Sequence, residues 1–162
     1  MNTTCRKTLV LGLGNDILTD DAIGLKVVRE VGRRLGSNAG VDVRETMEMG
    51  LALLDFIVGY EALVLVDSIQ TGRAAPGHVH DMTQEHLKAL PGRTPHFLGV
   101  KETLALGRQL GLAMPERFKI LAIEVQDPYT VSAELSPALE CAFDSIVDQV
   151  VRATSAEASA PA

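Results

Sequence analysis

The sequence has few of the residues that build disulfide-rich, aromatic or membrane-spanning structures. It contains no tryptophan, and aromatic residues are 4% of its 162 residues, so a core must consist of Leu, Val, Ile and Ala. Its two cysteines, Cys5 and Cys141, lack CxxC or metal-site spacing, which favours unpaired thiols in a reducing compartment. No apolar run approaches the roughly 20 residues of a membrane span, and no signal peptide is visible. We therefore expect a cytoplasmic protein.

Positive charge is also scarce. The chain has 15 Lys and Arg against 21 Asp and Glu, a formal net charge of −6. Without a basic run, nucleic acid is excluded as the expected partner, and an acidic surface argues against anionic membranes. A hydrophobic content of 46% and a charged content of 22% are typical of a globular chain whose length suits one domain.

Segments typical of strands alternate with segments typical of helices. Strands are expected at residues 8–13, 41–45, 62–66, 77–82 and 118–125, and helical segments at 20–35, 51–58, 84–90, 100–110 and 137–151. This alternation predicts a three-layer α/β/α fold with a mostly parallel (mixed) five-stranded sheet. We expect a single domain over residues 1–152 and a disordered, Ala/Ser-rich tail over residues 153–162.

Three polar groups follow predicted strands or occupy loops. Asp21 comes after the first strand, Asp67 ends the third, and His96 lies in a later loop. In parallel α/β sheets the ligand crevice lies beyond the carboxyl ends of the strands, so this order allows the three side chains to converge. Two carboxylates and one imidazole suit a hard or borderline divalent metal and leave coordination positions open.

Each of these groups also has a structural explanation. Asp20 and Asp21 would interact well with the dipole and free amides of a following helix. Asp67 needs a partner or water if it ends a buried strand. A single loop histidine such as His96 is more commonly structural than a ligand. On spacing alone, both interpretations remain open.

Other polar groups have simpler explanations. His78 and His80 share one strand face and could chelate a metal, but alternation along an edge strand explains them more simply. Glu124 follows the apolar part of a strand that points toward the expected crevice, but a structural role fits it better. No serine lies in a GxSxG turn, which argues against a serine hydrolase.

The loop at Gly12 and Gly14 invites a nucleotide-binding interpretation. The third glycine of GxGxxG is absent, and acidic residues follow where a pyrophosphate would lie. The same opening occurs in peptidyl-tRNA hydrolases, but no histidine precedes His78 to serve their chemistry.

Taken in order, four segments resemble the hydrogenase maturation endopeptidases, which process the large subunit of nickel-iron hydrogenases. The resemblance runs from about residue 8 to residue 151. The family patterns are G-x-G-N-x-x-x-x-D-[DE]-x-x-G, V-D-A, S-P-H-x-[LV]-G, and G-[IV]-[EQ] followed by L-[ST]-P. The matching residues are Gly12, Gly14, Asn15, Asp20, Asp21 and Gly24; Val66, Asp67 and Ser68; Thr94, Pro95, His96, Phe97, Leu98 and Gly99; and Ile123, Glu124, Leu135, Ser136 and Pro137.

The resemblance implies an endopeptidase that removes a C-terminal peptide from the nickel-loaded precursor of a hydrogenase large subunit. It also implies that Asp21, Asp67 and His96 are both the metal ligands and the catalytic residues, and that the substrate precursor supplies the nickel. The alternatives are a non-catalytic nickel checkpoint that binds the loaded precursor and, less well supported, a nucleotide-binding module.

The chain departs from the family patterns at a few positions. Asp21 replaces the commoner Glu, Ser68 replaces Ala, and Thr94 replaces Ser. Ala122 stands where a glycine is usual. Residues 45–50 replace a Gly-Gly-Thr-like turn, and this last departure concerns the loop expected to contact substrate rather than the metal ligands.

Overall fold

The computed structural model describes residues 7–37, 40–82 and 99–160. Its centre is a five-stranded sheet with the strand order β2-β1-β3-β5-β4. The strands are β1 (Thr8–Leu13), β2 (Val41–Thr46), β3 (Ala62–Ile69), β4 (Val79–Met82) and β5 (Arg117–Glu124). The pairs β1–β2, β1–β3 and β3–β5 are parallel, and β4 runs antiparallel to β5. The predicted mixed, mostly parallel sheet is confirmed.

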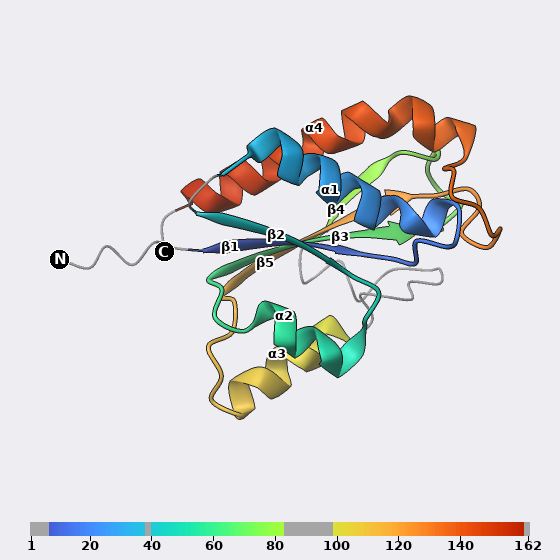
Figure 1. Ribbon diagram of the computed structural model, residues 1–162. Helices are drawn as coiled ribbons and strands as arrows, with labels where there is room; N and C mark the ends of the chain where they lie inside the picture. The colour runs from blue at the N-terminus through green and yellow to red at the C-terminus, as the bar shows by residue number, and fades with distance from the viewer. Residues whose placement is uncertain (1–6, 38–39, 83–98, 161–162) are drawn as a thin grey trace.

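Helices cover both faces of the sheet (Figure 1). The helical segments are the 3-10 turn η1 (Asp20–Ala22), α1 (Ile23–Leu35), the 3-10 turn η2 (Gly50–Leu53), α2 (Leu54–Ile57), α3 (Val100–Gln109) and α4 (Pro137–Ser159). Helices α1 and α4 lie together on one face, and α2 and α3 lie on the other. The three layers are therefore those predicted. None of the described helices is long and apolar enough to cross a membrane.

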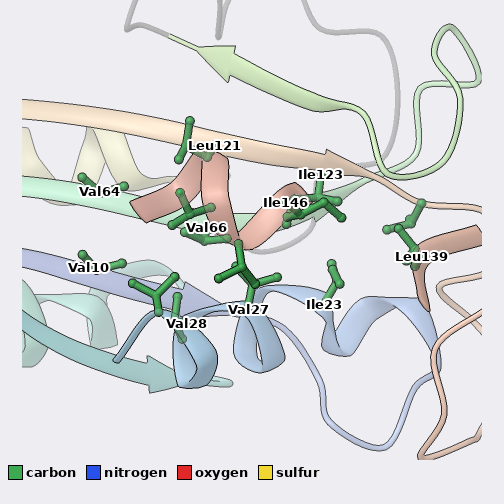
Figure 2. Packing of buried hydrophobic residues seen from close by; sticks show 14 of the residues in the cluster. Val10, Ile23, Val27, Val28, Val64, Val66, Leu121, Ile123, Leu139 and Ile146 are labelled. Atoms are coloured by element: carbon green, nitrogen blue, oxygen red, sulfur yellow. The ribbon is translucent and has the colours of Figure 1, made fainter. Parts of the chain in front are cut away.

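Alternation along the central strands produces two apolar cores. In β1, Leu9 and Leu11 face α2 and α3, whereas Val10 faces α1 and α4, as expected when successive side chains point to opposite faces. Figure 2 shows the second core, in which Val27 of α1 and Ile146 of α4 pack over the sheet. Burying each such side chain stabilises the fold by about 1.5–3 kcal/mol. A core of aliphatic residues can therefore hold the fold together without tryptophan.

One glycine allows α1 to pack against the sheet at very short range. A Cβ at Gly24 would lie 2.2 Å from the carbonyl oxygen of Leu13 and 2.6 Å from that of Val66. The first turn of α1 therefore rests on the carboxyl ends of β1 and β3. This contact fixes η1, which immediately precedes α1, at the same edge of the sheet.

Two sequence predictions are corrected by the structure. The tail expected from Ala153 is not disordered over residues 153–159, because α4 continues to Ser159. Alanine has the strongest intrinsic helix propensity, Thr154 is fully buried, and Arg117 donates a hydrogen bond to the carbonyl of Glu157 at 2.9 Å. Tertiary contacts thus hold a segment whose composition suggests disorder.

The second correction concerns β3. The predicted strand ends at residue 66 with Asp67 just beyond it, whereas the observed strand continues to Ile69 because Asp67 and Ser68 pair with Ala122 and Ile123 of β5. The helical turn predicted at 84–90 lies outside the described residues.

Candidate functional site

The strand order makes the boundary between β1 and β3 the expected position of a ligand site. Helix α1 connects β1 to β2 across one face of the sheet, and α2 precedes β3 on the opposite face. The chain therefore leaves the β1–β3 boundary in opposite directions, which is the topological switch point at which α/β proteins bind ligands. Any site built by the loops after β1 and β3 lies at this boundary.

Strand β3 is longer than β1 at this end of the sheet. The last residue pair between β1 and β3 is Gly12 with Val66, and β1 ends one residue later at Leu13, whereas β3 continues to Ile69. Ser68 and Ile69 therefore lie beyond the end of β1, on the side where the loop after β1 brings its polar side chains.

Two of the predicted site residues meet there through Ser68. The Ser68 hydroxyl donates a hydrogen bond to Oδ1 of Asp21 at 2.7 Å, and the Ser68 amide donates to Oδ1 of Asp67 at 2.8 Å. All three residues are buried, with Asp67 at 0% and Asp21 at 5% exposure. The structure thus brings together two predicted carboxylates that are 46 residues apart in sequence (67 − 21).

Glycine is needed where the loop after β1 turns toward this site. Gly14 has a φ of 150°, and a Cβ at this position would lie 2.2 Å from the carbonyl oxygen of Asp21. The loop backbone and η1 are therefore in direct contact. The close packing against η1 explains why residue 14 is a glycine. No approach of the backbone to a phosphate is needed to explain it.

Asp20, next to Asp21, has a different role. Its Oδ1 accepts a hydrogen bond from the Ser136 amide at 2.8 Å, and its Oδ2 accepts from the amides of Asp127 at 2.8 Å and Gln126 at 3.2 Å. No side-chain capping bond is made at the N-terminus of η1 or α1. Asp20 therefore does not bond the free amides of the helix that follows it, as one of the two interpretations suggested, and instead anchors the loop between β5 and α4.

The third predicted ligand, His96, lies outside the described residues. The chain resumes at Gly99, whose Cβ, if present, would lie 4.0 Å from the Cα of Gly50. Thr103 donates a hydrogen bond to the carbonyl of Gly50 at 3.1 Å. Gly50 follows the carboxyl end of β2, so residue 99 is at the same edge of the sheet as Asp67.

The described residues supply only part of a metal site. Within residues 7–37, 40–82 and 99–160, no group of three or more His, Cys, Asp or Glu side chains is placed to hold a metal ion. Asp21 and Asp67 provide carboxylate oxygens, which suit a hard or borderline divalent cation when an imidazole completes the set. His96 remains a predicted ligand on this basis.

Another buried carboxylate, Glu124, lies at the end of β5, outside the Asp21–Asp67 pair. Glu124 accepts hydrogen bonds from the Thr71 amide, the Gly72 amide and the Thr71 hydroxyl, and lies 2.9 Å from Nε2 of His80. Burial opposes ionisation of Glu124, but the bonds from Thr71, His80 and Gly72 outweigh it and lower its pKa.

This network favours the structural interpretation of His80, which lies in β4, and of His78, which directly precedes that strand. The rings of His78 and His80 are 4.6 Å apart at 77°, and His80 contacts Glu124 rather than the Asp21–Asp67 pair. Glu124 fastens the turn at residues 71–72 to the sheet, which agrees with the structural role predicted for it.

Ser68 is the residue of this site whose role the sequence does not reveal. Its position directly after Asp67 is the only local signal, and a serine there has no special spacing. Its partner Asp21 comes from a different element, so the contact exists only in the folded chain.

Solved structures with the same fold define the class of protein. The chain superimposes with a TM-score of 0.77 and 28% identity on the hydrogenase maturating endopeptidase HybD from E. coli, covering 91% of each chain. It matches the [NiFe] hydrogenase maturation protease HybD from Thermococcus kodakarensis with a TM-score of 0.68 and 26% identity, covering 91% of this chain and 99% of that one. The fold is that of an α/β endopeptidase.

Sequence comparison gives the family. The family model described as "HycI: Hydrogenase maturation protease" matches residues 25–153. The chain is 30% identical to the hydrogenase 2 maturation protease of Escherichia coli (strain K12) over 161 residues, covering 94% of this chain and 98% of the relative. It is 26% identical to the hydrogenase expression/formation protein HupD of Rhodobacter capsulatus, covering 90% and 70%. The chain belongs to the hydrogenase maturation protease family and is a peptidase that acts in hydrogenase processing.

Proposed function

We propose that this protein removes a C-terminal peptide from the nickel-loaded precursor of a nickel-iron hydrogenase large subunit. In this proposal Asp21, Asp67 and His96 contact the nickel that the precursor carries and so place the scissile bond. Family membership supports a hydrogenase subunit as the partner. The observation that carries the site is the convergence of the buried Asp21 and Asp67 side chains on Ser68 at the β1–β3 switch point.

The donor set fits this chemistry. Two carboxylates oppose the positive charge of a divalent ion, and an imidazole suits a borderline metal such as nickel. The nickel would polarise the scissile carbonyl or lower the pKa of an attacking water. A carboxylate of the same set would accept the proton of that water. Both routes need the same three residues.

The alternatives account for fewer observations. A non-catalytic nickel checkpoint would use the same three ligands, but the family and the structural relatives are proteases. A nucleotide-binding module needs the glycine loop to approach a phosphate, whereas the contact between Gly14 and the Asp21 backbone explains that glycine through packing. The endopeptidase is therefore the favoured function.

The test is the intact mass of the hydrogenase large subunit from cells that carry wild-type protein, Asp67→Asn or His96→Ala. We expect both variants to accumulate a subunit that is longer by one C-terminal peptide. Asp16→Asn is the matched control, because Asp16 is an exposed aspartate on the loop that leads into η1. Normal maturation in the Asp67→Asn and His96→Ala cells would reject the proposed site.

Purified components separate cleavage from a checkpoint role. Wild-type protein mixed with nickel-loaded precursor should release the C-terminal peptide, and Asp67→Asn should not. Stable binding of the wild-type protein to the precursor without any change in its mass would instead favour the checkpoint.

A further inference from the structure

We infer that Ser68 is a positioning residue for the reaction, because its hydroxyl holds the Asp21 carboxylate in place. This inference rests on the proposed role of Asp21 and Asp67. The Ser68 hydroxyl lies 2.7 Å from Oδ1 of Asp21, and Ser68 itself is 2% exposed. A hydroxyl that donates to a carboxylate makes a charge-assisted bond, which is among the stronger hydrogen bonds in proteins.

The backbone and side chain of Ser68 act on different carboxylates. The amide of Ser68 donates to Asp67 at 2.8 Å, whereas its hydroxyl donates to Asp21. Pairing between β3 and β5 fixes the Ser68 backbone, since Ser68 is in register with Ile123. Replacing the side chain therefore removes the bond from Ser68 to Asp21 and leaves the amide bond to Asp67 intact.

The two carboxylates are positioned by different elements. Asp21 lies in the short 3-10 turn η1, and its side chain reaches from the loop after β1 to Ser68 of β3. Asp67 is part of β3, whose backbone pairs with β5. The Ser68 hydroxyl therefore ties the loop that carries Asp21 to the strand that carries Asp67.

The short side chain of Asp21 matches the space that Ser68 leaves beside it. A glutamate is longer by one methylene and would extend into the volume that the Ser68 hydroxyl occupies at 2.7 Å from Asp21. A short carboxylate with a serine and a long carboxylate with an alanine are therefore two ways to fill the same buried space.

The test is a double-mutant cycle on the purified full chain with nickel-loaded precursor. Ser68→Ala, Asp21→Glu and the double variant Asp21→Glu/Ser68→Ala are compared with wild type. The initial rate of peptide release, followed by intact mass at several precursor concentrations, gives kcat and KM. The unfolding midpoint in urea shows whether each variant is folded.

We expect Ser68→Ala to lower kcat about tenfold, as is typical when an outer-shell partner of a ligand is removed, with a change in KM of less than about twofold. Asp21→Glu alone should also be slow, because the longer side chain meets the Ser68 hydroxyl. The double variant should cut faster than Asp21→Glu. A merely structural role for Ser68 would lower the unfolding midpoint and would give multiplicative losses in the cycle.

Two results would overturn the inference. One is cleavage by Ser68→Ala at the wild-type kcat, and the other is a double variant whose loss equals the product of the two single losses. Asp67→Asn, assayed in parallel, tests the underlying site. If Asp67→Asn is inactive while Ser68→Ala is unaffected, only the role of Ser68 fails; if Asp67→Asn cuts normally, the proposed site fails as well.

Discussion

Two adjacent aspartates show how residues of one type acquire different roles. Asp21 turns toward β3 and contacts Ser68, whereas Asp20 turns toward the loop after β5 and accepts three backbone hydrogen bonds. Both are buried. A carboxylate that accepts several amide bonds is well satisfied as a structural anchor, so Asp20 is not available to a metal or substrate.

The anchor role of Asp20 predicts a large loss of stability on truncation. Asp20→Ala should reduce the free energy of unfolding by about 2–3 kcal/mol, because the amides of Asp127 and Ser136 lose a charged acceptor. Urea denaturation measures this loss, and hydrogen exchange should show faster exchange at those two amides. The exposed neighbour Asp16 is the control, since Asp16→Ala should stay within about 0.5 kcal/mol of wild type. Equal effects of the two substitutions would contradict the anchor role.

Glu124 predicts a pH dependence of stability. Its pKa is lowered in the folded state, because the bonds from Thr71, His80 and Gly72 outweigh the opposing effect of burial. The folded state thus binds its proton less tightly than the unfolded state, in which the carboxyl group has its ordinary pKa. The stabilisation is fully present above the pKa of the unfolded state and is lost as the pH falls through the lower folded pKa.

The measurement for Glu124 is the free energy of unfolding of wild type and Glu124→Gln between about pH 7 and pH 3. The variant should be less stable at neutral pH by about 1–3 kcal/mol, since an amide replaces a charged acceptor. The difference should shrink as the solution is acidified. A difference that stays constant over this range would show that the charge of Glu124 does not contribute.

At the scale of elements, α1 is the helix whose contacts position the site. Its first turn packs on the carboxyl ends of β1 and β3 through Gly24, and Gly12 of β1 faces it, where a Cβ would lie 2.4 Å from Cγ2 of Val28. This close contact holds η1, and therefore Asp21, against the end of β3. The distance between helix and sheet is set by two residues without side chains.

Two glycines of α1 predict opposite results. Gly24→Ala should reduce stability by more than about 3 kcal/mol or prevent folding, because its Cβ would overlap the carbonyl oxygen of Leu13 at 2.2 Å. At Gly32 a Cβ would meet Val43 only at ordinary contact distances of 3.6–4.0 Å. Gly32→Ala should therefore stabilise the protein by up to about 1 kcal/mol through helix propensity. Thermal and urea unfolding of both variants test the contrast, which fails if Gly24→Ala is as stable as Gly32→Ala.

At the scale of the whole molecule, α4 contacts elements that are far apart in the sequence. It packs with α1 over the sheet, and its last turns contact the start of β5, where Arg117 bonds the carbonyl of Glu157 at 2.9 Å and its carboxylate at 3.3 Å. Thr154 is fully buried in this region. The Ala-rich end of the described chain is thus part of the folded domain.

This arrangement predicts that truncation within α4 weakens the entire fold. A chain ending at Ala153 loses Thr154 and the partner of Arg117, and its free energy of unfolding should fall by about 1–3 kcal/mol. A chain ending at Ser159 keeps the whole helix and should match wild type within about 0.5 kcal/mol. Urea denaturation distinguishes the two, and equal stability of both truncations would support the disordered tail that the composition suggests.

Sequence patterns predict the layered fold well because they depend on local physics. Short apolar runs must be buried on both faces, and apolar residues at helical spacing must cover a sheet. The patterns fail at Asp67 and at the end of α4, where the outcome depends on pairing with β5 and on contacts with Arg117. Long-range partners of this kind leave no periodic signal along the chain.

The sequence by itself determined the α/β class, the polar residues at the strand ends and, through its ordered motifs, the family. Only the tertiary structure decided that Ser68 links Asp21 and Asp67, and that Asp20 accepts hydrogen bonds from the amides of residues 126, 127 and 136. The physical reason is that these partners come from other elements of the fold. Their distance along the chain leaves no local signal at Asp20, Asp21 or Ser68 that would identify them.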